Sequence, residues 1–417
     1  MLQASNLTHM ASYLDSVPFS GIIRIRDMMY SVDRPFRLDQ GDVSFDAPAS
    51  VKDALVRGVA ENRTHYVQTT GIPPLLDLLA AKLRERNAIP VDTTDEVMVT
   101  SGGIHGVYCV CQGLLEPGDE VLLPDPEWPP AAGNILAAHG VPVGYPLYEH
   151  LGWRPDLDEL ARLITPRTRA IYLNSPNNPT GGVLTRADLE RVAEIARERN
   201  LWVISDEAYE DVLFDGHRHL SIASLPGMYE RTIPVYTFSK TYAITGLRLG
   251  YLAVHDPVIR DRVRKVLFYT VSNTTSLVQY GGIGALSGSQ DVVAEFRREL
   301  GARRDLFYKG IAKSAHGILS GPPPSGAFYA FLRVDPAWRS PLPDAPASIS
   351  WAMTEFLIKR GRIGCVPGVD FGAHGEGYVR FCFARDRQEL QGALESMESI
   401  LVSRGAVLHP PVSFRPS

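Results

Sequence analysis

The stretch RTIPVYTFSKTYAITGLRLGYLAV, residues 231–254, decides the fold of this chain. Its two apolar runs, 233–238 and 249–254, have the length and composition of buried strands in a parallel-type sheet. Lys240 follows the first run after a single serine, and Arg248 stands immediately before the second. The sequence therefore predicts an amine and a guanidinium at one end of a largely buried layer.

Lys240 is predicted to have a chemical role, because lysine is rarely buried without a partner or a function. Hydroxyl groups flank it at Thr237, Ser239 and Thr241. Desolvation and a nearby cation such as Arg248 lower the pKa of a lysine, which leaves more free amine to attack a carbonyl group. Arg248 is also a suitable partner for a phosphate. The pair predicts Schiff-base chemistry beside an anion-binding cation.

The composition is typical of a globular enzyme. With 417 residues the chain is too long for one ordinary core, which indicates two or three domains. A net charge of −5 argues against a nucleic-acid partner. There is no signal-peptide pattern, and no apolar run reaches the about 18 residues of a membrane span, so no membrane association and a cytoplasmic location are expected.

The cysteines and histidines predict no metal site and no disulfide framework. Cys109 and Cys111 lie in an apolar, helix-like run, where packing is the favoured explanation. His217 and His219 form a short pair, but the sequence shows no second cluster that would complete a metal site.

Other polar residues stand where predicted strands end. Residues 96–100 predict a strand that leads through small residues into a helix near Ile104. Such a helix N-terminus binds anions, but simple loop chemistry is an equally good interpretation of these residues alone. A strand at 201–205 ends at Asp206, where a carboxylate is costly unless it is paired; a helix N-cap is an equally good interpretation from the residue alone. The sequence NNPTG at 177–181 needs no function beyond a turn.

Strand and helix patterns alternate from residue 50 to residue 290, which predicts a doubly wound α/β unit. Within it, Thr185 and Asp188 have the spacing of a capping box at the start of a helix.

Taken together, these segments resemble the class I and II aminotransferases, the fold type I enzymes that use pyridoxal phosphate (PLP). The motif TFSKT with RLGY eight residues after the lysine, NPTG after a buried strand, Tyr-x4-Gly from Tyr66 and Arg-x-x-Phe-Ala from Arg380 carry the resemblance. It implies a mostly parallel seven-stranded sheet flanked by helices, plus a smaller α+β domain. The implied division is an N-terminal arm and part of the small domain at 1–45, a large PLP-binding domain at 46–290, and a C-terminal small domain at 291–417.

The resemblance implies a role for each ring-binding residue. Lys240 would hold PLP as a Schiff base and later move the substrate proton, as general base and acid. Asp206 would keep the pyridine nitrogen protonated, so that the ring accepts electrons. Tyr209 and Asn178 would bond the 3′ oxygen, and Trp128 would stack on the ring.

The resemblance also implies a phosphate site and a dimer. Gly103, Ile104, Thr237 and Arg248 would surround the phosphate, although relatives often carry a hydroxyl or long polar side chain at or beside position 104. Tyr66 would reach the phosphate of the neighbouring subunit, which makes a homodimer with shared active sites the expected assembly.

For the substrate, the resemblance implies that Arg380 binds the α-carboxylate as a bidentate fork, with Gly41 and Asn178 beside it. Where some dicarboxylate-specific relatives have an arginine, this chain has Phe268, which favours a neutral or aromatic amino acid. Three other residues remain alternative sources of the positive charge that a second substrate carboxylate would need: Arg24, Arg26 and His105.

The expected reaction is transfer of an amino group from an L-amino acid to a 2-oxo acid, with 2-oxoglutarate as the expected acceptor. A PLP-dependent lyase, decarboxylase or amino-acid oxidase would keep the same residues and stays open as an alternative. A non-catalytic, aminotransferase-like effector-binding protein is disfavoured, because no DNA-binding segment precedes residue 50.

Overall fold

The computed structural model describes residues 15, 17 and 19–401. Its larger sheet has eight strands in the order β1-β8-β7-β6-β5-β2-β3-β4. The strands are β1 Val97–Thr100, β2 Glu120–Asp125, β3 Val141–Tyr148, β4 Arg154–Pro155, β5 Thr168–Asn174, β6 Trp202–Asp206, β7 Thr232–Thr237 and β8 Gly250–Ala253.

Five neighbouring strands of this sheet, β7, β6, β5, β2 and β3, are parallel. Strand β8 runs antiparallel to both β7 and β1, so the strand after Arg248 reverses direction instead of continuing the parallel pattern. The fold class predicted from the sequence is confirmed, with eight strands where seven were expected. The short β4, which adds antiparallel to the edge strand β3, is among them.

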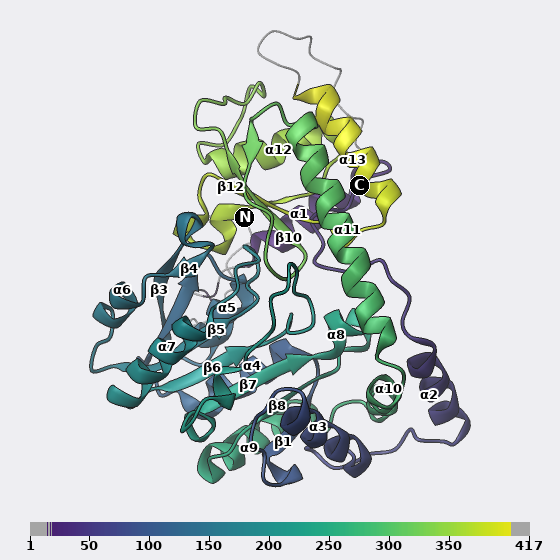
Figure 1. Cartoon of the computed structure of the whole chain (residues 1–417), viewed down its shortest axis with the longest axis vertical. Helices are drawn as coiled ribbons and strands as arrows, with labels where there is room; N and C mark the ends of the chain where they lie inside the picture. The colour runs from purple at the N-terminus through teal and green to yellow at the C-terminus, as the bar shows by residue number, and fades with distance from the viewer. Residues whose placement is uncertain (1–14, 16, 18, 402–417) are drawn as a thin grey trace, which may run out of the picture.

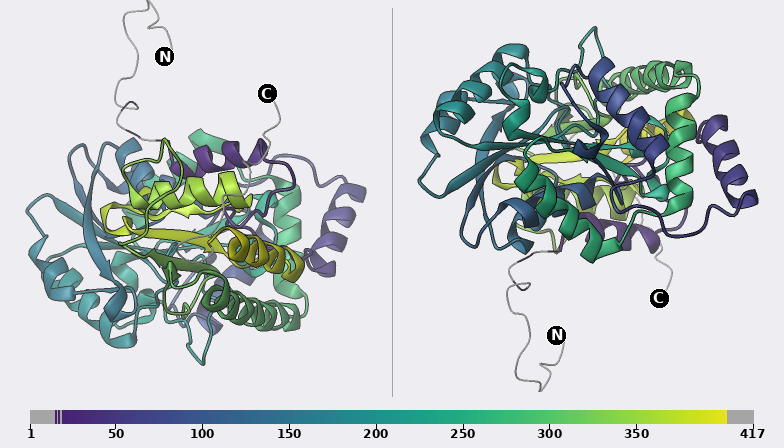
Figure 2. Two further views of the ribbon diagram at one scale, coloured as in Figure 1. Left: turned by 90° about the horizontal axis from the view of Figure 1, so that it is seen from above. Right: turned by 90° about the horizontal axis from the view of Figure 1, so that it is seen from below.

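Helices cover both faces of the larger sheet. The helices before and within this part are α1 Gly21–Tyr30, α2 Ala49–Ala60, α3 Pro73–Glu85, α4 Gly103–Leu114, α5 Pro129–Ala137, α6 Leu157–Arg162, α7 Arg186–Glu198, α8 Phe238–Thr241, α9 Pro257–Val271 and α10 Ser276–Ser287. Both views of Figure 2 show α2 at an outer edge of the molecule.

Alternate strand residues pack into different cores, because successive side chains point to opposite faces of a strand. In β5, Ala170 and Tyr172 join the core that contains residues of α4, α5 and α9. Ile171 and Leu173 join the core that contains residues of α7. The strands are therefore buried on both faces, as expected of parallel strands between helical layers.

Local sequence signals explain where α7 begins. The side chain of Thr185 accepts a hydrogen bond from the Asp188 backbone N–H at 3.2 Å, and Asp188 accepts one from the Thr185 backbone N–H at 2.7 Å. This is the capping box predicted from the sequence.

A second, four-stranded sheet has the order β11-β12-β10-β9, and all of its pairings are antiparallel. Its elements are α11 Asp291–Ser314, β9 Leu319–Ser320, β10 Tyr329–Val334, α12 Ile349–Gly361, β11 Val366–Pro367, β12 Tyr378–Cys382 and α13 Arg387–Ile400. In Figure 1 this part lies above the larger sheet, and α11 runs from one part to the other. The ends of the predicted domains, 1–14 and 402–417, lie outside the described residues.

Candidate active site

The carboxyl ends of the parallel strands meet at one edge of the larger sheet. Asn174 ends β5 and Asp206 ends β6, and the two residues are paired in register. A cavity of about 300 Å³ lies at these strand ends, which is where open α/β sheets bind ligands. Every predicted site residue except Tyr66 lines it. Five further lining residues were not predicted as site residues: Ile22, Asn174, Ala208, Ser239 and Tyr329.

Lys240 lies on the short helix α8 directly after β7, and its side chain enters the cavity. Its Nζ donates a hydrogen bond to the Gly41 carbonyl oxygen at 2.6 Å. Burial lowers the pKa of Lys240 to about 8; the negative charge of Asp42 opposes the decrease, and Arg248 and Arg380 add to it. A larger fraction of this amine is therefore unprotonated near neutral pH than for an exposed lysine.

Asp206 is a buried carboxylate held by two donors. Tyr172 Oη donates to Oδ2 at 2.9 Å, and the Ala208 backbone N–H donates to Oδ1 at 3.1 Å. Burial raises the pKa of Asp206 to about 6, while these hydrogen bonds and the charge of Lys240 work in the opposite direction. No helix begins at Asp206, so the N-cap interpretation is wrong.

The N-terminus of α4 and the Arg248 guanidinium form a cradle for an anion. Gly102 has φ = 79°, and a Cβ atom at this position would lie 2.4 Å from Nη2 of Arg248. Gly103, Ile104 and Thr237 line the cavity beside it. Free backbone N–H groups at a helix N-terminus, together with a guanidinium, favour a phosphate.

Arg380 enters the cavity from β12 of the smaller sheet. Its side chain is buried, with Nη1 donating to Asn178 Oδ1 at 3.0 Å and Nη2 donating to the Asp39 carbonyl oxygen at 2.7 Å. Its Nε is buried without a hydrogen-bond partner. An unpaired buried donor is costly, so this guanidinium is suited to an incoming carboxylate.

Trp128 lines the cavity, and its neighbour Glu127 lies behind it against the end of β5. Glu127 is buried, and its two carboxylate oxygens face the side-chain amides of Asn174 at 2.6 Å and Asn177 at 2.9 Å. Burial raises the pKa of Glu127 well above its usual value. Asn174 lines the cavity, and its Oδ1 is buried without a hydrogen-bond partner.

Tyr66 does not line the cavity of its own chain and is 90% exposed. Three residues were considered as the positive charge for a second substrate carboxylate, and none of them lines the cavity either: Arg24, Arg26 and His105. Arg24 stacks on Trp351 at 4.1 Å and lies 3.5 Å from Glu355. Arg26 is paired with Asp27 at 3.1 Å. These arginines therefore have partners elsewhere.

His105 has a structural role in this chain. Its Nδ1 accepts a hydrogen bond from the Ser101 backbone N–H at 3.2 Å, so the ring proton belongs on Nε2, which faces Thr270 Oγ1 at 2.9 Å. Burial lowers the pKa of His105, which favours the neutral ring. His105 ties the turn before α4 to α9.

Sequence reasoning missed Glu127, Tyr172 and Tyr329 as members of the site. Glu127 stands in a proline-rich loop, where an acid is normally exposed, and the two tyrosines stand in apolar strands, where packing explains them. Only the position of Tyr172 offered a signal, because it stands two residues before the polar strand end Asn174 and therefore on the same face of β5.

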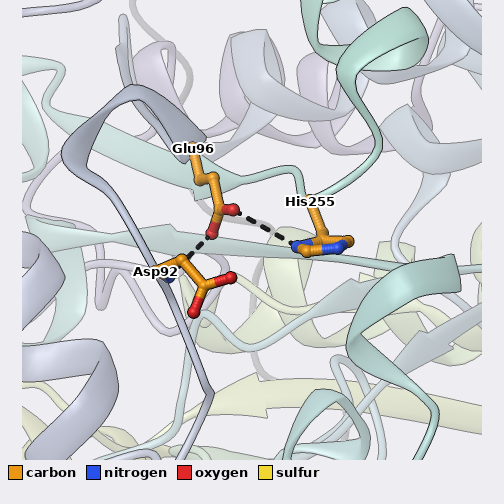
Figure 3. A group of neighbouring side chains, drawn as sticks. All are labelled: Asp92, Glu96 and His255. Atoms are coloured by element: carbon orange, nitrogen blue, oxygen red, sulfur yellow. Dashed lines mark hydrogen bonds and ion pairs between the residues drawn. The ribbon is translucent and has the colours of Figure 1, made fainter.

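Two groups of potential metal ligands lie elsewhere among the described residues: Asp92, Glu96 and His255 (Figure 3), and Glu207, Glu210 and His219.

In the first group, Glu96 accepts hydrogen bonds from the Asp92 backbone N–H and from Tyr229 Oη. His255 faces the other carboxylate oxygen of Glu96 at 3.2 Å. In the second, four side chains bond to Glu207. The sequence shows no cluster beside His219, whereas the fold brings two carboxylates to it. Because protein groups already satisfy these carboxylates, neither group is assigned as a metal site.

Across residues 15, 17 and 19–401, no helix has the length and apolar character that crossing a bilayer requires.

Comparison with known proteins places this geometry in a family. The chain matches aminotransferase class I and II over residues 34–397. It is 36% identical to aromatic-amino-acid aminotransferase 2 of Thermococcus litoralis and 36% identical to aspartate aminotransferase of Pyrococcus abyssi, each over 94% of this chain and 98% of the relative. The solved structure of aspartate aminotransferase from Thermus thermophilus with maleate has a TM-score of 0.85 and 32% identity, covering 95% of this chain and 100% of that one.

The fold and the strand-end cavity define a fold type I α/β enzyme. The chain belongs to the class I and II aminotransferases, whose members depend on PLP, and its function is amino-group transfer. The family and function predicted from the sequence are thus confirmed.

Proposed function

We propose that the cavity binds PLP through Lys240 and transfers an amino group from a neutral L-amino acid to a 2-oxo acid, with 2-oxoglutarate as the acceptor. The observation that carries this proposal is the shared cavity of Lys240 and Asp206, one an amine of lowered pKa and the other a buried acid. The unprotonated Lys240 amine can form a Schiff base with the aldehyde of PLP, and the Asp206 carboxylate can keep the pyridine nitrogen protonated.

The residues present fit such a group. The cradle of Gly102 and Arg248, which a Cβ atom would fill, suits the phosphate. The buried acceptor Asn174 Oδ1 and the buried donor Arg380 Nε belong to residues that line the cavity, and both lack hydrogen-bond partners, which suits a polar occupant. Trp128 supplies a flat apolar wall for a ring.

When bound, PLP supplies an aldehyde and an aromatic ring that withdraws electrons from the substrate carbon. Arg380 fixes the α-carboxylate by a fork of two hydrogen bonds. Lys240, which would hold the aldehyde, would also act as the general base and acid that moves the substrate α-proton. Asp206 would keep the pyridine nitrogen protonated, and Tyr209 and Asn178 would hydrogen-bond the 3′ oxygen.

The substrate side chain is proposed to be neutral. The cations that line the cavity are Lys240, Arg248 and Arg380, and each is already assigned to the aldehyde, the phosphate or the α-carboxylate. The apolar side chains Ile22 and Ile104 are also part of the lining. The names of the relatives include both aromatic and aspartate aminotransferases, so a comparison of neutral donors with aspartate decides this point.

We further propose a homodimer in which Tyr66 contacts the phosphate of the partner's site. Support comes from large apolar side chains that are exposed on the same chain, among them Val56, Tyr66, Phe268 and Tyr269. Such side chains are typical of surfaces that are covered by another subunit. The division into 1–45, 46–290 and 291–417 and the cytoplasmic location stay predictions.

Absorption spectroscopy of the purified chain tests the proposed function. With added PLP, the unmodified chain is expected to show a visible band, which a neutral L-amino acid bleaches while forming pyridoxamine phosphate and the 2-oxo acid. Lys240→Ala should lack the band. A colourless chain, or an identical band in Lys240→Ala, would contradict the proposal. Release of an alkene, carbon dioxide or a side-chain fragment would indicate a lyase or decarboxylase, and oxygen consumption an oxidase. A fast reaction with aspartate alone would overturn the neutral-substrate assignment.

A further inference from the structure

Tyr209 and Tyr329 share a hydrogen bond at the cavity. Their hydroxyl oxygens lie 2.7 Å apart, and both side chains line the cavity. Tyr209 follows β6 of the larger sheet, whereas Tyr329 is the first residue of β10 in the smaller sheet. The side chains are 5% and 1% exposed, so bulk water does not serve them. This bond joins the two sheets at the site.

The number of protons restricts the direction of this bond. A phenol has one proton to donate and two lone pairs that accept. Burial raises the pKa of both hydroxyls, so each keeps its proton. Across the described part of the chain, Tyr209 is the only hydrogen-bond partner of the Tyr329 hydroxyl. If Tyr209 donated to Tyr329, the Tyr329 proton would be buried without an acceptor, which is costly.

The reverse direction satisfies both protons when the cavity holds an acceptor beside Tyr209, which is where the proposed function puts the 3′ oxygen of PLP. Tyr329 then donates to Tyr209, and the proton of Tyr209 is free for that oxygen. The charge of Arg380 acts to lower the pKa of both hydroxyls, but its guanidinium is stacked on the Tyr329 ring, 4.5 Å from the ring centre, and this contact favours Tyr329 as the donor. Hydrogen bonds in such a chain strengthen one another.

We propose that Tyr329 is a positioning residue: by donating to Tyr209, it turns the Tyr209 proton toward an anionic oxygen of the bound cofactor. This inference rests on the proposed function, because PLP supplies that oxygen at its 3′ position. Tyr329 acts through Tyr209, so its effect is the stabilisation of the oxygen's anionic form and not the binding of substrate.

The pH titration of the cofactor's visible band tests this proposal. Tyr329→Phe keeps the ring and removes only the hydroxyl. The midpoint of the titration is expected to move to higher pH by about half a unit to one unit, because one hydrogen bond to the anionic form is weakened. Tyr209→Phe should move it further in the same direction. The double variant should titrate like Tyr209→Phe alone, since Tyr329 has no effect without Tyr209.

Tyr308→Phe is the matched control, because Tyr308 lies on α11, away from the cavity lining. It should leave the midpoint unchanged. A Tyr329→Phe midpoint equal to that of the unmodified chain, or additive shifts in the double variant, would overturn the role of Tyr329 while leaving the proposed function intact. A chain that gives no Lys240-dependent band would overturn both.

Discussion

A Cβ atom at Gly102 would lie 2.4 Å from Nη2 of Arg248, so the guanidinium rests directly on the backbone at the start of α4. This close approach concentrates a fixed positive charge and a helix N-terminus at one place. A side chain at position 102 would separate Arg248 from this helix N-terminus.

Gly102→Ala is expected to weaken PLP binding by roughly 10- to 100-fold, because the methyl group displaces Arg248 from the phosphate, and a hydrogen bond to a charged group is worth about 1.5–3 kcal/mol. Equilibrium titration with PLP measures the effect. Gly118→Ala is the control: Gly118 also has positive φ, at 87°, but nothing lies within 4 Å of its added methyl group. Both variants place an alanine at positive φ, so equal losses of PLP affinity would show that the contact with Arg248 is unimportant.

Asp206 should destabilise the cofactor-free protein at neutral pH. Burial raises its pKa from 3.8 to about 6. Its contribution to stability is therefore fully present below the unfolded pKa and is lost as the pH rises through 6. We expect cofactor-free Asp206→Asn to be more stable than the unmodified chain at pH 8, by about 3 kcal/mol at most.

Denaturant unfolding of the two cofactor-free proteins between pH 4 and pH 8 checks this. The difference in unfolding free energy should shrink as the pH falls and disappear near pH 4. A difference in unfolding free energy that does not depend on pH would mean that burial of the charged Asp206 carboxylate does not destabilise the protein. Added PLP should reverse the order at pH 8, because the unmodified chain gains an ion pair with the ring nitrogen that the asparagine cannot form.

Much of this site was predictable because its residues lie at strand ends within short motifs. The positions of Asp206, Lys240 and Arg248 follow from apolar runs that stop at polar residues, and the register places Asn174 beside Asp206 as parallel strands require. The strand boundaries differ from the predicted ones by one or two residues in most cases, since frayed ends carry little sequence signal.

The remaining features depend on contacts between distant segments. The reversal of β8 cannot be read from an apolar run, because parallel and antiparallel central strands have similar compositions. Tyr329 becomes part of the site because β10 of the other sheet brings it to Tyr209, 120 residues away in the sequence. Tyr66 lies on the surface of its own chain, so its predicted role requires a second subunit.

Arg380→Lys is expected to raise KM for the amino-acid donor by roughly 10- to 100-fold with a smaller effect on kcat, because lysine keeps the charge but loses the planar fork. Steady-state kinetics with the preferred donor measures it. Arg385→Lys is a suitable control, since Arg385 pairs with Glu389 at 2.8 Å and does not line the cavity. An unchanged KM in Arg380→Lys would remove Arg380 from carboxylate binding.

Tyr66 permits a test of shared active sites by subunit mixing. Tyr66→Phe alone should weaken PLP binding roughly 10-fold, through loss of a hydrogen bond to the phosphate. Lys240→Ala alone should be inactive. In a mixed dimer, the subunit with the Tyr66→Phe substitution keeps Lys240 and receives an intact tyrosine from its partner, so one complete site forms. After an equal mixture is unfolded and refolded together, about a quarter of all sites should bind PLP with normal affinity and be active. If Tyr66 instead acts within its own chain, the mixture will show only the weak sites of the Tyr66→Phe variant, and activity at limiting PLP will not exceed that of the separate proteins.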